Sequence, residues 1–78
     1  MKMFEVNLRS VGDVRDFVAL ASVQPFELTV GNDRRSVNGK SFLQIFCLEL
    51  RKPQQVKMDC TEEEFQRFYD AVERFRIP

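Results

Sequence analysis

Two side chains in this sequence, Ser41 and Asp13, could accept a phosphoryl group, and each stands where a helix is predicted to begin. The first turn of a helix carries free N–H groups and the positive end of the helix dipole. Both stabilise a capping hydroxyl, a carboxylate or a phosphate. Carboxylates also serve as phosphoryl acceptors in some enzymes. For both residues, however, a capping role alone is sufficient to account for the residue type.

Ser41 heads the second of these helices, in the stretch "KSFLQIFCLEL". Ser41 and Gln44 have the spacing of a capping box, in which each side chain pairs with a backbone N–H group near the other residue. Lys40 adjoins Ser41 and would add positive charge beside a phosphate. A helix cap and a regulatory phosphorylation site are compatible, and the spacing does not choose between them.

The chain contains no histidine, which removes the commonest general base and the commonest zinc ligand. Cys47 and Cys60 lack the CxxC spacing of a metal or redox site, and we expect both to behave as small apolar residues. The acidic groups at Asp13 and at residues 62–64 are interpreted as solvated helix starts. A chain of 78 residues also leaves little room for a substrate cleft. We therefore expect no catalytic residues, metal or cofactor, and no enzyme activity.

Twelve basic and twelve acidic side chains cancel, so no net field would attract nucleic acid or an anionic membrane. Arg34 and Arg35, with Lys40, form only a small basic patch, without the interleaved aromatics of a nucleic-acid surface. No apolar run reaches the length of a membrane span, and the N-terminal stretch "MKMFEVNLRS" begins a strand rather than a signal peptide. We expect one domain over residues 1–78, located in the cytoplasm.

Alternating apolar and polar residues predict four strands, and helical periodicity predicts three helices. The predicted strands are 4–8, 26–30, 36–39 and 55–60, and the predicted helices begin at Ser10 or Asp13, at Ser41 and at Thr61. Pro25 follows the first helix, the second is expected to end at Arg51, and Thr61 with Glu64 forms a second capping box. The order predicts an α+β fold, with a four-stranded antiparallel sheet covered by helices on one face.

The middle helix has more apolar residues than one buried side can use. Ile45 and Leu48 share one side of the helix, whereas Phe42, Leu43 and Phe46 project on another. One interpretation is that the two phenylalanines fill the core. The other is that Phe42, Leu43 and Phe46 stay exposed as a binding patch for a partner protein, or for a second copy in a homodimer of modest area.

The segment "SVNGKSFLQIFCLEL" resembles the HPr phosphocarriers of the bacterial sugar phosphotransferase system. In that family a Lys-Ser pair opens a short, partly exposed apolar helix. The resemblance implies an HPr-like open-faced β-sandwich of order βαββαβα. It places Ser41 on the serine that an ATP-dependent kinase phosphorylates in Gram-positive HPr. It also places Phe42, Leu43 and Phe46 on the apolar positions through which HPr docks to its enzymes and to a transcriptional regulator.

The histidine motif of that family, Gly-x-His-x-Arg-Pro, is replaced here by "VGDVRDF". Asp13 takes the histidine position, Arg15 keeps the arginine and Asp16 replaces the proline, while Gly12 lies one place from the expected glycine. A phosphohistidine relay is therefore excluded. Asp13 is left as a fixed negative charge beside Arg15 or, as an alternative, as an aspartyl phosphate acceptor.

These features together predict a non-catalytic, HPr-like regulatory or protein-binding domain. Some HPr relatives that lost the histidine and kept the serine act in gene regulation, and the expected partner is a protein such as a serine kinase or a transcriptional regulator. Ser41 would be a phosphorylation switch, and Arg15 and Lys40 would be supporting residues. The alternatives are an unswitched interaction or homodimerising domain, and a phosphoacceptor that uses Asp13. We expect a monomer or a weak homodimer.

Overall fold

The computed structural model describes residues 1–77 of the chain. Its elements are β1 (Lys2–Val6), α1 (Val11–Ser22), β2 (Leu28–Gly31), β3 (Ser36–Asn38), α2 (Phe42–Ile45), β4 (Gln54–Met58), α3 (Glu62–Ala71) and a 3-10 helix, η1 (Glu73–Phe75). The predicted α+β class and order of elements are confirmed, and η1 follows the last predicted helix.

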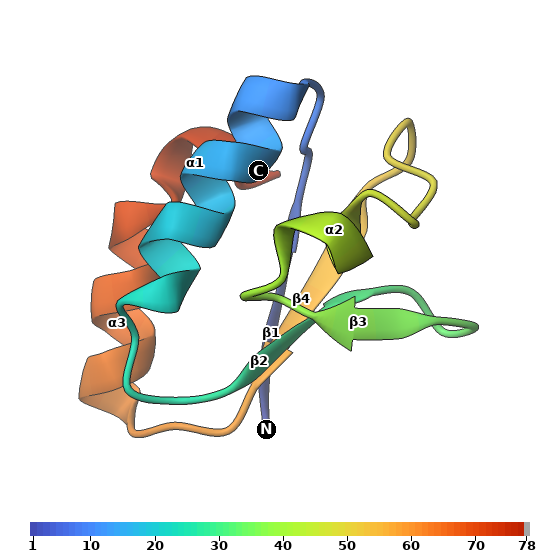
Figure 1. Ribbon diagram of the computed structural model, residues 1–78. Coiled ribbons are helices and arrows are strands. Elements are labelled where there is room, and N and C mark those ends of the chain that lie inside the picture. The colour runs from blue at the N-terminus through green and yellow to red at the C-terminus, as the bar shows by residue number, and fades with distance from the viewer. Residues whose placement is uncertain (78) are drawn as a thin grey trace.

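The sheet has the strand order β1-β4-β2-β3, and all its pairings are antiparallel (Figure 1). Val56 of β4 is paired with Phe4 of β1 on one side and with Val30 of β2 on the other. The predicted hairpin is confirmed, because β2 and β3 pair directly, with Val30 opposite Val37. Apolar residues in register across neighbouring strands give the sheet one continuous buried face.

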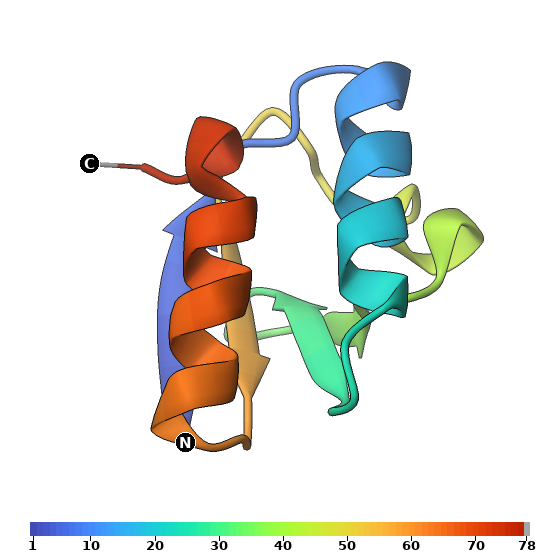
Figure 2. The ribbon, with the colours of Figure 1, turned by 90° about the vertical axis from the view of Figure 1, so that its left-hand side faces the viewer.

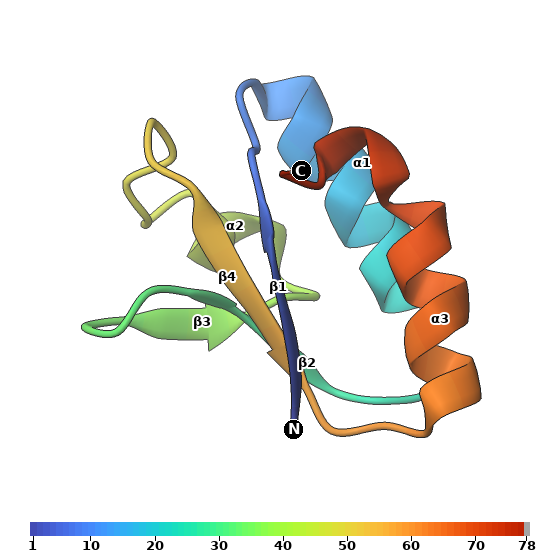
Figure 3. The same ribbon diagram turned by 180° about the vertical axis from the view of Figure 1, so that it is seen from behind.

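Helices α1 and α3 lie side by side over this face (Figures 2 and 3). Phe68 of α3 is fully buried between them and the sheet. Its ring centroid lies 5.9 Å from those of Phe17 and Phe26 and 6.1 Å from that of Phe4. The opposite face of the sheet is open, and Met3 is 55% exposed there because it alternates with the inward-facing Phe4.

Local capping chemistry fixes where α1 and α3 begin. Of the two candidates for the first helix, Ser10 is the N-cap, and its Oγ accepts the N–H of Asp13 at 3.0 Å. The capping box at α3 is confirmed. Thr61 Oγ1 accepts the N–H of Glu64 at 3.1 Å, and Glu64 Oε1 accepts the N–H of Thr61 at 3.0 Å.

The predicted extent of the middle helix, Ser41 to Arg51, is wrong, because α2 spans only Phe42–Ile45. The backbone bonding changes directly after Ile45, because the N–H groups of Cys47 and Leu48 donate to carbonyls three residues back, those of Gln44 and Ile45, at 3.0 Å each. The segment that follows is held by Gln54, at the start of β4, whose buried amide donates from Nε2 to the carbonyls of Glu49 at 2.7 Å and Lys52 at 2.9 Å.

Within residues 1–77, no helix is both long enough and apolar enough to cross a membrane.

Candidate functional site

Ser41 is the N-cap of α2, as its sequence position predicted. Its backbone is extended, and Oγ accepts the N–H of Gln44 at 3.3 Å. The reciprocal half of the predicted capping box is wrong. Gln44 Oε1 instead accepts the N–H of Asn38 at 3.0 Å, and so ties α2 to the end of β3. The hydroxyl of Ser41 therefore sits on a short helix that is anchored directly to the sheet.

The ammonium group of Lys40 has partners other than Ser41. Its Nζ donates to the carbonyl of Gln24 at 3.0 Å and lies 3.3 Å from Oε2 of Glu27. The side chain is only 21% exposed. The lysine thus fastens the entrance of α2 to the loop that follows α1, a structural role that the sequence did not indicate.

The exposed apolar surface of α2 consists of Leu43, which is 77% exposed, and Phe46, which is 37% exposed. We call these two residues the α2 patch. Phe42 was also expected to be exposed, but it is partly buried against the core. Its ring lies 4.7 Å from that of Phe46 at 75°, an edge-to-face arrangement that holds Phe46 in place. Ile45 and Leu48 are buried, as their shared side of the predicted helix indicated.

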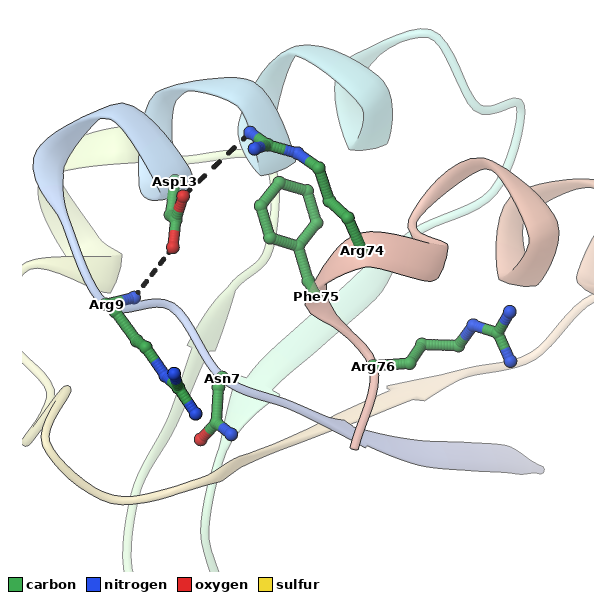
Figure 4. Close-up of a pocket in the computed structure, with 6 residues that line it drawn as sticks. All are labelled: Asn7, Arg9, Asp13, Arg74, Phe75 and Arg76. Carbon is green, nitrogen blue, oxygen red and sulfur yellow. Dashed lines mark hydrogen bonds and ion pairs between the residues drawn. The ribbon is translucent and has the colours of Figure 1, made fainter. Parts of the chain in front are cut away.

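Asp13 lies in the first turn of α1, and both of its carboxylate oxygens have partners (Figure 4). Oδ2 accepts the N–H of Arg9 at 3.1 Å, and Oδ1 lies 3.9 Å from Nη2 of Arg74. The side chain is 25% exposed. The carboxylate is therefore held by Arg9 at one oxygen and by Arg74 at the other, and it is not free in solvent.

Arg74, in η1, is the residue of this site that sequence analysis missed. Its Nη2 also lies 2.5 Å from Oδ2 of Asp16, a second carboxylate of α1. No local pattern pairs residues 58 positions apart, so nothing in the sequence marked Arg74. Arg15, which the family resemblance placed beside Asp13, is exposed, and its Nη2 lies over Gly12.

A hollow of about 370 Å³ opens beside Asp13 and is lined by Asn7, Arg9, Asp13, Arg74, Phe75 and Arg76. The structure does not bring Ser41 into this hollow. The hydrogen bond from Lys40 to Gln24 places the start of α2 near the C-terminal end of α1, whereas Asp13 is in its first turn. The two candidate acceptors are therefore separate sites. In residues 1–77 no three metal-ligating side chains gather into a cluster.

The fold is similar to the crystal structure of HPr-C-His from Thermoanaerobacter tengcongensis, with a TM-score of 0.73 and 22% identity. The alignment covers 94% of this chain and 92% of that chain. No family model matches the sequence, and no curated protein matches it. The chain therefore has an HPr-like fold, as the resemblance around Ser41 implied.

Proposed function

We propose that this chain is a regulatory, protein-binding domain on an HPr-like fold that has no phosphohistidine carrier activity. The observation that carries the proposal is the α2 patch. Leu43 and Phe46 are exposed on a helix that buries its other side, and apolar side chains in such a place gain free energy when a partner covers them. Burying a leucine side chain contributes about 2 kcal/mol.

The composition and the Asp13 site support the absence of carrier chemistry. The chain has no histidine, and Asp13 stands where the resemblance places the phosphorylated histidine. The contacts of Asp13 with the N–H of Arg9 and with the guanidinium of Arg74 are sufficient for a role in the fold that needs no phosphorylation. These neighbours make Asp13 part of the scaffold.

Ser41 supplies the proposed switch. A phosphate on its Oγ would bring about two negative charges to the entrance of α2, directly before the patch. It would also displace the hydrogen bond from the N–H of Gln44 to the neutral hydroxyl. Phosphorylation would therefore change the charge beside the α2 patch without changing its apolar side chains, Leu43 and Phe46.

The proposal is tested by incubating the purified protein with an HPr-type serine kinase and ATP, followed by intact-mass measurement and site mapping. Ser41→Ala is the control for the acceptor, and an authentic HPr is the control for the kinase. A single phosphate on Ser41 that is absent from the variant is the expected result. If the kinase fully modifies the authentic HPr and leaves this chain unmodified, the proposed switch is wrong and Ser41 is only a helix cap.

A further inference from the structure

A second hollow, of about 350 Å³, adjoins the one beside Asp13. It is lined by Asn7, Arg9, Leu50 and Arg51, so Asn7 and Arg9 are common to both hollows. The two form one groove that runs from η1, past the segment between β1 and α1, to the loop before β4. We call it the arginine groove.

Half of the eight arginines of the chain line this groove, namely Arg9, Arg51, Arg74 and Arg76. Asp13 is the only carboxylate that lines either hollow in the described part of the chain, and its oxygens are engaged by the backbone N–H of Arg9 and the guanidinium of Arg74. Asp16 and Glu49 pair with Arg74 and Arg51 beside the groove, so four arginines stand against three carboxylates there, and a chain without net charge has a weakly positive surface at this place.

The four arginines differ in how firmly they are held. Arg74 pairs with Asp16, and Arg76 lies over the ring of Tyr69, with its guanidinium carbon 3.8 Å from the ring centroid. Arg51 pairs with Glu49 through two hydrogen bonds of 3.1 Å, but its side chain is 90% exposed, and an exposed pair is screened by solvent and readily exchanged for another carboxylate.

Arg9 is the cation available at the centre of the groove. Its guanidinium has no hydrogen-bond or ion-pair partner in residues 1–77, and the same holds for the side-chain amide of Asn7. Figure 4 shows the side chain of Arg9 directed away from the carboxylate of Asp13 and toward Asn7. A guanidinium and an amide placed in this way can hold an oxyanion between them.

We propose that the arginine groove binds an acidic segment of the partner protein, an inference that rests on the proposed protein-binding function. Arg74 is engaged by two carboxylates, and Figure 4 shows the side chain of Arg76 directed away from the hollow, so Arg9 and the exposed Arg51 are the cations that a ligand would meet. They belong to two different segments of the chain and match carboxylates along an extended segment better than a single phosphate. Leu50 offers an apolar contact beside them. Phe75, the aromatic residue of the groove, is buried and presents no face on which a nucleic-acid base could stack.

The test uses fluorescein-labelled hexaglutamate as the probe and fluorescence anisotropy in low-salt buffer as the measurement. Hexaglutamate has no apolar side chain for the α2 patch, and the positions of the amide shifts distinguish the groove from the basic patch of Arg34 and Arg35. We expect saturable binding that weakens as salt is added, and amide shifts in the ¹⁵N spectrum that centre on Asn7, Arg9 and Arg51. We expect Arg9→Ala to weaken binding about five-fold while leaving the spectrum of the free protein folded.

Arg67→Ala is the matched control, because Arg67 is an equally exposed arginine of α3 that pairs with Glu63 outside the groove. Equal weakening by both variants, or shifts centred elsewhere, overturns the proposal. The same holds if hexathymidylate binds at these residues as tightly as hexaglutamate, since the groove would then be a general polyanion surface. Each of these outcomes leaves the α2 patch untouched, so failure of this inference is distinguishable from failure of the proposed function.

Discussion

Asp13 and Arg74 face each other across the junction between α1 and η1, with Oδ1 and Nη2 3.9 Å apart. Arg74 also binds Asp16 at 2.5 Å, so one guanidinium holds two carboxylates on the same side of α1. Asp13 completes the arrangement by accepting the N–H of Arg9. Asp13, which the sequence resemblance aligns with the histidine of HPr, thus forms with Asp16 and Arg74 an electrostatic clasp between segments far apart in the sequence.

The clasp predicts that Asp13→His does not create a phosphohistidine carrier. The imidazole would stand beside Arg74, which disfavours its protonated form, and Arg74 would lose one of its two carboxylates. Asp16 would remain where the family motif has proline. The measurement is phosphoryl transfer from phosphoenolpyruvate through enzyme I of the phosphotransferase system, followed by intact mass. Acid-labile phosphate on the variant at the level of an authentic HPr would contradict the prediction.

The two carboxylates of the clasp should differ in their contribution to stability. Asp13 accepts a backbone N–H and lies in the first turn of α1, where the helix dipole favours negative charge. Asp16 makes only an exposed ion pair. We expect Asp13→Asn to lower the free energy of unfolding by about 1 kcal/mol and Asp16→Asn by less than about 0.5 kcal/mol. Urea unfolding monitored by circular dichroism measures both. The reverse order would show that the ion pair is the dominant interaction.

Replacement of Gly31 and of Gly12 by alanine should have opposite effects on stability, because the space around the two glycines differs. A Cβ added to Gly31 would lie 2.6 Å from the Cα of Ser36, and closer still to the carbonyl oxygen of Arg35, so the hairpin would have to shift. The same atom on Gly12 meets nothing nearer than 3.7 Å. We expect Gly31→Ala to destabilise the fold by about 1–3 kcal/mol, and Gly12→Ala to stabilise it by about 0.5 kcal/mol through helix propensity. Thermal unfolding of both variants tests this; a neutral Gly31→Ala would mean that the hairpin is loosely packed.

The two thiols should react at different rates and with different pH dependence. Burial raises the pKa of the Cys60 thiol above its ordinary value, and the negative charge of Glu64 adds to this effect. Cys47 is exposed. Since the thiolate is the reactive form, at a given pH fewer Cys60 thiols are ionised, and its reaction rate should continue to rise at higher pH than that of an ordinary thiol. Iodoacetamide labelling with peptide mapping, across a pH series, should show Cys47 modified first. Preferential labelling of Cys60 near neutral pH would contradict this reading.

The sequence predicted those parts of the fold that depend on near neighbours. Helical spacing places Val14, Phe17, Val18 and Ala21 on one apolar stripe, of which Val18 is partly buried and the other three are buried. Thr61 with Glu64 marked the start of α3. Alternation of residue types identified the inward-facing Val56 and Met58 of β4. These features follow from periods of two or 3.6 residues and from caps that span one turn.

Features that depend on distant residues were not predictable in this way. The helical period runs on past Ile45, but the backbone turns into bonds three residues back at Cys47 and Leu48, and the buried amide of Gln54 holds the segment that follows by two of its carbonyls. Arg74 could not be assigned to the Asp13 site, because the two residues meet only when η1 is packed against α1. Tertiary contacts of this kind override local pattern.

The shortness of α2 bears directly on the proposed function. A helix of eleven residues would have spread its apolar side chains over a long surface, whereas the observed α2 concentrates exposure on Leu43 and Phe46. Phe42 stabilises Phe46 from the core side. The exposed apolar area of α2 is therefore small and concentrated, and it is this area that a partner would cover under the proposed function.

The most direct test of the α2 patch is the affinity of the purified chain for an HPr-type serine kinase, measured by isothermal titration calorimetry without ATP. We predict that Leu43→Asp raises the Kd at least about ten-fold, since it places a charge in the centre of the interface. Met3→Asp, which alters an exposed apolar residue on the open face of the sheet, should leave the Kd unchanged. Absence of binding by the unaltered chain, or equal loss in both variants, would contradict the α2 patch as the docking surface.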